Sequence, residues 1–213
     1  MDLSIIIRSD KRHNTEQSGN QVEALVSVLQ MEIESIRHQA AVEVIVVDSA
    51  SAEGDLRSVI QQFPSVRLVP SALELNPPQS YNLGANLARS RSLLFLSADT
   101  LLAHGSLLKC LDMVVQYPRC SLFYGRLFEH HVNSVGSNSP TGHSGGALAF
   151  ENGVGHGVPL LVSKGVLLEI GGFDEHLEEL QSQQDLCQRI KAFGREVMAW
   201  DEFRTVDLSR KPA

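Results

Sequence analysis

Two acidic residues follow directly after apolar segments of strand length, where their carboxylates could bind a metal ion and a nucleotide. A carboxylate at Asp99 could hold a hard divalent cation whose remaining positions accept diphosphate oxygens. Asp48 stands beside Ser49 and Ser51, whose hydroxyls are suited to hydrogen bonds with a base or a ribose. An aspartate in such a place also commonly caps the following helix or begins a turn. Each residue alone therefore has a structural alternative, whereas two of them at neighbouring strand ends would face one crevice.

Alternating strand and helix patterns over the first 130 residues would position these side chains. The predicted strands cover 3–8, 43–47, 66–69 and 92–96, and the predicted helices begin near Asn20, cover 56–63 and cover 82–88. Repeated strand–helix–strand units favour an α/β fold with a mostly parallel central sheet and helices on both faces. Ligands of such sheets bind at the carboxyl ends of the strands. Between the third strand and the third helix, the prolines at 70–80 predict a loop.

The second half of the chain has a less regular pattern. Residues 134–157 hold seven glycines in 24 residues and predict a flexible, glycine-rich surface loop. The sequence then predicts a strand at 160–163, a short helix, a turn at 171–174, a helix from about 182 to 193 and a last strand near 197–200. We expect one domain over 1–213, because this length leaves no space for a second core.

Composition narrows the class of protein and its location. Apolar residues make up 43% of the chain and the net charge is −7, which favours a globular protein and disfavours nucleic acid or anionic lipid as a partner. The apolar runs are too short to cross a bilayer, and the acidic start does not resemble a signal peptide. Three cysteines without CxxC spacing suit a reducing compartment and argue against a zinc site. We therefore expect a cytoplasmic protein without a transmembrane segment.

Common nucleotide motifs are absent from the sequence, and one hydrolase motif occurs in an unsuitable context. Neither a G-x-G-x-x-G fingerprint after the first strand nor a P-loop is present. The segment Gly142–Gly146 fits the G-x-S-x-G pattern of a nucleophile elbow around Ser144. That elbow requires a strand before the serine and a helix after it, and the flanking residues predict neither. A flexible glycine loop is the better interpretation.

Five segments resemble, in order and spacing, the family 2 glycosyltransferases of GT-A fold. They are Leu3–Ser9 (LSIIIRS), Val44–Ser51 (VIVVDSAS), Asn82–Asp99 (NLGANLARSRSLLFLSAD), Lys164–Glu175 (KGVLLEIGGFDE) and Asp185–Val197 (DLCQRIKAFGREV). The resemblance covers roughly residues 3–200. It implies transfer of a sugar from a nucleotide diphosphate sugar (a UDP-, GDP- or dTDP-sugar) to an acceptor hydroxyl, with inversion at the anomeric carbon and with Mg²⁺ or Mn²⁺.

The resemblance also implies roles for particular residues. Asp99 would be the last carboxylate of the family's DxD motif, which ligates the metal. The implied nucleotide-sugar pocket contains Arg8, Ser9, Asp48, Ser49, Ser51, Asn82 and Ser97, with Asp48 against the base. In such a site the cation and nearby donors neutralise the charge on the departing diphosphate, while a base takes the acceptor proton.

Three residues depart from the family pattern. Ser97 replaces the first carboxylate of DxD, so its contact becomes that of a hydroxyl. Ser182 and Gln183 stand where the family has Glu-Asp, and neither can act as a base. Asp185 is the candidate catalytic base, with Glu178 or Glu179 behind it. The alternative for Asp185 is a carboxylate that stabilises the start of a helix through the macrodipole.

These departures leave two hypotheses about function. The chain is either an inverting glycosyltransferase or a catalytically inactive protein of the same fold that binds a nucleotide or a partner. The sequence does not specify the base, the sugar, the acceptor or the oligomeric state.

Overall fold

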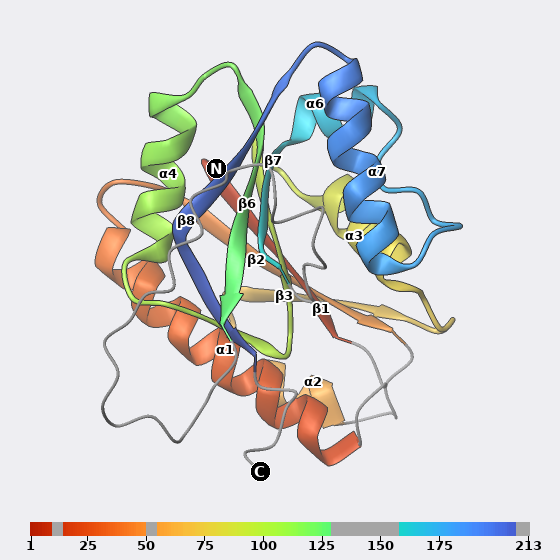
Figure 1. Ribbon diagram of the computed structural model, residues 1–213. Helices are drawn as coiled ribbons and strands as arrows, with labels where there is room; N and C mark the ends of the chain where they lie inside the picture. The colour runs from red at the N-terminus through yellow and green to blue at the C-terminus, as the bar shows by residue number, and fades with distance from the viewer. Residues whose placement is uncertain (10–14, 50–54, 129–157, 208–213) are drawn as a thin grey trace, which may run out of the picture.

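The computed structural model describes residues 1–9, 15–49, 55–128 and 158–207 and places an eight-stranded mixed sheet at their centre (Figure 1). The strand order is β3-β2-β1-β4-β7-β6-β8-β5. In chain order the strands are β1 Leu3–Ser9, β2 Val42–Ser49, β3 Val66–Ser71, β4 Ser92–Ser97, β5 Thr100–Leu102, β6 Cys120–Phe128, β7 Leu160–Ser163 and β8 Glu196–Asp207.

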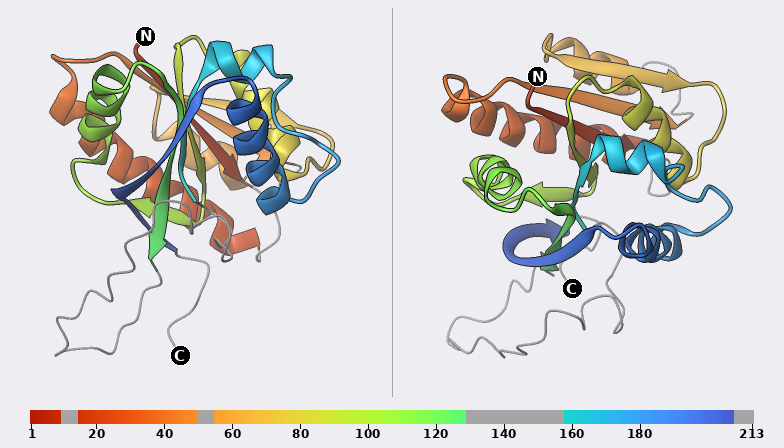
Figure 2. Two further views of the ribbon diagram at one scale, coloured as in Figure 1. Left: turned by 45° about the horizontal axis from the view of Figure 1, so that its top comes forward. Right: turned by 90° about the horizontal axis from the view of Figure 1, so that it is seen from above.

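Helices cover both faces of this sheet (Figure 2). Their bounds are α1 Thr15–Ile36, α2 Asp55–Gln61, α3 Pro77–Leu87, α4 Ser106–Gln116, α6 Lys164–Glu169 and α7 Glu179–Ala192. One core cluster joins the sheet to α1, α2 and α4, and a second joins it to α3, α6 and α7. The predicted α/β class, with a mostly parallel sheet between two helical layers, is confirmed.

The parallel half of the sheet brings the predicted site residues to one edge. Strands β3, β2, β1 and β4 run parallel, with Arg8 opposite Ser97 and Ser9 opposite Asp48. Every residue of β1 is buried because helices lie on both of its faces. The carboxyl ends of β1, β2 and β4 therefore meet at one edge, which we call the carboxyl edge.

The prediction of a loop at 70–80 was wrong at both of its ends. Strand β3 continues through Pro70 to Ser71, and it lies at the edge of the sheet, where a missing N–H breaks no ladder. Helix α3 begins at Pro77 because prolines are tolerated in the first turn, whose N–H groups lack partners within the helix. Asn76 caps it: its Oδ1 accepts from the backbone N–H of Gln79 at 2.9 Å, and Gln79 Oε1 accepts from the Asn76 N–H at 2.9 Å.

Other element boundaries also differ from the prediction. Helix α1 begins at Thr15 rather than near Asn20, and α7 begins at Glu179 rather than about 182. Strand β8 continues to Asp207, where its last residues pair with β5. The predicted glycine-rich loop at 134–157, including Ser144, lies outside the described residues. Within the described parts of the chain, no helix has both the length and the apolar character needed to span a bilayer.

Candidate functional site

The ends of β1 and β4 are linked by a buried hydrogen bond. Arg8 Nη2 donates to Ser97 Oγ at 3.0 Å, so the residue that replaces the first DxD carboxylate is engaged by a guanidinium. The Ser97 carbonyl accepts from Thr100 Oγ1 at 2.7 Å, which fixes the tight turn between β4 and β5. Asp99 lies in this turn and is partly exposed. The turn therefore places Asp99 at the carboxyl edge, with its Oδ1 atom buried.

A second buried contact ties the first residue of α7 to the same edge. Arg8 Nη2 donates to both carboxylate oxygens of Glu179, at 3.2 and 3.1 Å, and the two side chains are 6% and 3% exposed. The Tyr81 hydroxyl donates to Glu179 Oε1 at 3.2 Å, and its ring centroid lies 5.8 Å from Arg8 Cζ. Burial and the Glu179 charge raise the pKa of Tyr81, so its hydroxyl stays protonated. Arg8 thereby joins strand, helix and tyrosine in one charged cluster.

The end of β2 contributes polar groups beside this cluster. Asp48 is buried next to Ser9, its register partner on β1. The Ser9 hydroxyl, fully buried, has no hydrogen-bond partner among the described residues. Ser49 Oγ accepts from the Leu75 N–H at 2.6 Å and donates to the Leu75 carbonyl at 3.1 Å, so it fixes the segment before α3. Ser51 lies outside the described residues.

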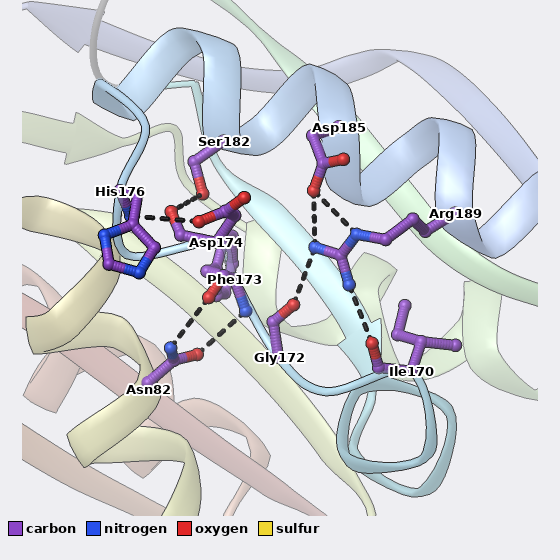
Figure 3. Close-up of polar contacts among 9 residues, drawn as sticks. All are labelled: Asn82, Ile170, Gly172, Phe173, Asp174, His176, Ser182, Asp185 and Arg189. Atoms are coloured by element: carbon purple, nitrogen blue, oxygen red, sulfur yellow. Dashed lines mark hydrogen bonds and ion pairs between the residues drawn. The ribbon is translucent and has the colours of Figure 1, made fainter.

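Asn82 is engaged by the turn that precedes α7 (Figure 3). Its Oδ1 accepts from the Phe173 N–H at 2.9 Å, and its Nδ2 donates to the Phe173 carbonyl at 2.9 Å. Nδ2 also donates to Glu175 Oε1 at 2.8 Å. Gly172 has a φ of +79°, and a Cβ there would come within 2.6 Å of Asn82 Oδ1. The amide of Asn82 thus holds the turn against α3.

Asp185 is paired with Arg189 one turn further along α7 (Figure 3). Its Oδ2 accepts from Arg189 Nε and Nη2, both at 2.6 Å. Arg189 also donates to the carbonyls of Ile170 and Gly172, each at 2.8 Å. Asp185 therefore orients an arginine that holds the turn, which is a positioning role that sequence reasoning did not consider.

An open pocket of about 420 Å³ lies between α3, this turn and α7. It is lined by Asn82, Gly171–His176, Asp185 and Arg189. The side chain of Asp185 is 30% exposed, so it can meet a ligand there. Ser182 Oγ donates to the Asp174 carbonyl at 3.0 Å, and His176 N–H donates to Asp174 Oδ1 at 2.9 Å (Figure 3).

The two residues at the family's Glu-Asp place face inward from α7. Ser182 and Gln183 are buried on the helix face that also carries Glu179. The Nε2 atom of Gln183 lacks a hydrogen-bond partner within the described ranges. A hydroxyl and an amide cannot take a proton at neutral pH, so neither residue is a base.

The structure brings Arg8, Ser97 and Glu179 into contact. Sequence reasoning named Glu179 only as a reserve base and missed its pairing. A signal existed, because Glu179, Ser182, Gln183 and Leu186 have the i, i+3, i+4, i+7 spacing of one helix face. The predicted helix start at 182 excluded Glu179 from that face.

A divalent cation fits the carboxyl edge only if its ligands come largely from a substrate. Among the described residues, no three His, Cys, Asp or Glu side chains form a group that could hold a metal. Mg²⁺ is commonly held through one or two carboxylates plus phosphate oxygens and water. Asp99, as a single partly exposed carboxylate, suits this second arrangement.

Comparison with solved structures shows that the fold is that of the GT-A glycosyltransferases. TarS from S. aureus (residues 1–349) aligns over 97% of this chain and 60% of its own, with 14% identity and a TM-score of 0.68. The same protein in complex with UDP-GlcNAc aligns over 100% of this chain at 15% identity and a TM-score of 0.68. The mannosyltransferase PcManGT from Pyrobaculum calidifontis, in complex with GDP-Man and Mn²⁺, aligns over 98% of this chain and 57% of its own, with 14% identity and a TM-score of 0.68.

The amino-acid sequence shows the family to which the chain belongs. A model of glycosyl transferase family 2 matches residues 24–148, more than half of the chain, and the chain belongs to this family. A sequence comparison with curated proteins gives no match. The chain spans about 60% of the length of the TarS chain that it resembles.

Proposed function

We propose that this chain transfers a sugar from a nucleotide diphosphate sugar to an acceptor hydroxyl, with inversion at the anomeric carbon. The observation that carries the proposal is the carboxyl edge of a family 2 fold, where Arg8, Ser97 and the Asp99 turn are fixed together. Solved neighbours of this fold are complexes with UDP-GlcNAc, UDP and GDP-Man, which supports a nucleotide diphosphate sugar as donor. The proposal takes 1–213 as one cytoplasmic domain.

In this proposal the donor diphosphate lies at the carboxyl edge. Asp99 would hold Mg²⁺ or Mn²⁺, which when bound supplies positive charge to the leaving diphosphate. The Arg8 guanidinium is held in place by Glu179 and Ser97, so it is preorganised beside the same charge. Asp48 and Ser9, at the neighbouring strand ends, would contact the nucleoside.

Asp185 is the proposed base. Both bonds from Arg189 go to Oδ2, and the Asp185 side chain lines the 420 Å³ pocket in which an acceptor could lie. For turnover its other oxygen, Oδ1, would take the acceptor proton as the new glycosidic bond forms. The structure also supports a positioning role for Asp185, through its pair with Arg189. The two roles predict different effects of the same substitutions.

A titration of UDP, GDP and dTDP with and without Mn²⁺ tests the donor site. We expect metal-dependent binding that falls about tenfold or more in Asp99→Ala, because the only proposed metal carboxylate is lost. Asp112→Ala is a matched control, since Asp112 is exposed on α4. Absence of binding for all three nucleotides would remove the proposal.

Two further variants separate the roles of Asp185. If Asp185 is the base, Asp185→Asn abolishes hydrolysis and transfer while nucleotide affinity and melting temperature stay near those of the wild type. If Asp185 only orients Arg189, both Asp185→Asn and Arg189→Lys lower the melting temperature. In that case neither substitution abolishes hydrolysis and transfer without also lowering stability.

A catalytically inactive, nucleotide-binding protein is the second candidate. The observation that favours it is the buried amide of Gln183 at the place of the family's base. Nucleotide binding without any hydrolysis or transfer, in the wild type and also in Gln183→Asp, would support this candidate. Turnover that appears in Gln183→Asp would show that the site lacks only a base.

A further inference from the structure

A second pocket, of about 300 Å³, lies at the opposite edge of the sheet. It is found where β4 and β6 begin and β7 ends, toward the top of Figure 1. The end of α4, the start of α6 and the segment after α7 surround it. Ser92 begins β4 and Ser97 ends it, so the two edges are about 16 Å apart along the strand. The pocket is therefore separate from the carboxyl edge.

The charged residues of this pocket are both arginines. Arg91 and Arg195 line it and are exposed, and no aspartate or glutamate is among its lining residues. Within the described parts of the chain, neither guanidinium forms an ion pair. The Glu196 carboxylate, next to Arg195 in the chain, lies close enough to act on Cys120 but is not part of the described lining. The whole chain carries −7, so a pocket whose charged lining residues are two arginines is a local positive site on an acidic protein.

Serine hydroxyls from three adjacent strands add hydrogen-bond donors. Ser92 on β4 is the register partner of Ser163 on β7, and their side chains share one face. Ser121 on β6 precedes Leu122, which pairs with Val162, so it lies next in the same row. All three serines line the pocket, and none of their hydroxyls bonds to another described residue. Such a row can donate to an anion without losing an existing bond.

The rest of the lining is apolar and uncharged. Phe123, Leu161 and Val166 are buried lining residues that offer apolar contact. Burial raises the pKa of the Cys120 thiol to about 11, so at neutral pH this lining residue carries no charge that would repel an anion. A volume of about 300 Å³ is at the lower end of the range of small-molecule sites.

We propose that this pocket binds a small organic phosphate, with the phosphate between Arg91 and Arg195 and its organic part against Phe123 and Val166. Guanidinium groups match the oxygens of phosphate in geometry and charge, and two of them balance a dianion. The serine hydroxyls complete the set of donors. The site is independent of the proposed donor site.

Titration of the full chain with phenyl phosphate, followed by calorimetry and by backbone amide NMR shifts, tests this proposal. We expect saturable binding whose affinity falls about tenfold or more in the double variant Arg91→Ala/Arg195→Ala, since two charge-assisted contacts are lost. The double variant Arg37→Ala/Arg57→Ala removes the same charge from two exposed places, one just after α1 and one on α2, and should bind within about twofold of the wild type. All four arginines are exposed, so melting temperatures should stay close.

Three comparisons decide the outcome. Amide NMR shift changes on addition of phenyl phosphate that are confined to residues around β4, β6 and β7 support a separate site, provided that they are the same in the presence of saturating UDP. Weaker binding of inorganic phosphate and of benzyl alcohol supports recognition of both parts of the ligand. Lack of saturable binding, full affinity in Arg91→Ala/Arg195→Ala, or displacement by UDP would overturn the proposal.

Discussion

Two arginine–glutamate pairs stand at opposite edges of the same sheet and have the same ion-pair distance. Arg8–Glu179 lies at the carboxyl edge, and Arg89–Glu43 lies at the opposite edge, where the parallel strands begin and which we call the amino edge. Both pairs have a closest N–O distance of 3.1 Å. Their surroundings differ, because Arg8 is 6% exposed and Arg89 is 68% exposed. The glutamates are buried in both pairs.

The difference shows that distance alone does not determine what an ion pair contributes. Glu43 also accepts hydrogen bonds from the Ser4 hydroxyl and the Arg89 backbone N–H, so its buried charge is satisfied without the Arg89 side chain. Arg8 is cut off from water, and Glu179 gives it a buried countercharge at 3.1 Å. The amino edge thus holds a carboxylate that stabilises the fold, whereas the carboxyl edge holds a fixed guanidinium beside the proposed donor site.

Among the variants that test this comparison, removal of Glu179 should cause the largest loss in the free energy of unfolding. Glu179→Ala leaves the buried Arg8 charge without the Glu179 carboxylate, and we expect a loss of about 3–5 kcal/mol in the free energy of unfolding, measured in urea. The double variant Arg8→Met/Glu179→Leu removes both charges and should recover most of that loss. A loss below about 1 kcal/mol for Glu179→Ala would show that water or another group takes over the pairing.

Glu43→Gln should have the next largest effect, and the effect should depend on pH. Burial opposes ionisation of Glu43, but hydrogen bonds from Ser4 and Arg89 and the Arg89 charge outweigh it and lower the pKa of this carboxyl below 4.5. A lowered pKa stabilises the folded protein above the unfolded value and loses that contribution as the pH falls through the folded value. We expect Glu43→Gln to cost about 1–2 kcal/mol at pH 7, with the difference from wild type shrinking below about pH 4.5.

Urea unfolding at pH 7, 5 and 3 measures this dependence. Glu34→Gln is the control, because Glu34 is exposed and its pair with Arg37 is on the surface. A cost for Glu43→Gln that stays constant from pH 7 to pH 3 would contradict the assignment.

Arg89→Ala should have a small effect, in contrast to the buried pair. The Arg89 side chain is 68% exposed and its backbone N–H, which bonds Glu43, is kept in the variant. We expect a loss of about 0.5 kcal/mol or less in the same urea assay. A loss above about 1.5 kcal/mol would mean that the amino-edge pair resembles the carboxyl-edge pair after all.

Cysteine reactivity should show where in the molecule the loss of the Glu179 pair acts. Burial raises the pKa of Cys187 on α7 to about 12 and that of Cys120 to about 11, so both thiols are protonated at neutral pH and should react slowly with iodoacetamide. In Glu179→Ala the start of α7 is released, and we expect faster alkylation of Cys187 relative to Cys120, measured by peptide mass spectrometry. An equal acceleration of both cysteines would indicate global loosening instead.

Local patterns in the sequence were sufficient to predict the sheet that carries the site. The run at 3–8 holds four apolar residues, Leu3 and Ile5–Ile7, because β1 is covered on both faces, and this pattern is visible without the structure. The start of α1 was missed because residues 15–19 add no apolar stripe to it. The prolines at 70–80 led to the wrong prediction of a continuous loop. Proline is tolerated in an edge strand and in the first turn of a helix, and these prolines lie in such places.

The candidate site was less predictable, because its contacts join distant parts of the chain. Arg8 and Ser97 could be placed at strand ends from their neighbours, but the pairing of Arg8 with Glu179 spans 171 residues. Asn82 meets Phe173 across 91 residues, so its role in holding a turn has no local signal. The i, i+4 spacing of Asp185 and Arg189 was readable, whereas the carbonyls that Arg189 holds were not.

The long strand β8 has a consequence for how this chain acquires its fold during synthesis. It lies parallel to β6 from residue 196 to 206, and residues 205–207 also form the ladder that attaches β5 at 100–102 to the sheet. Strand β5 carries the polypeptide directly away from the Asp99 turn. A ribosome must therefore release residue 207 from its exit tunnel before that turn gains its full support, so the proposed donor site is completed later than the parallel strands β1 to β4 beside it.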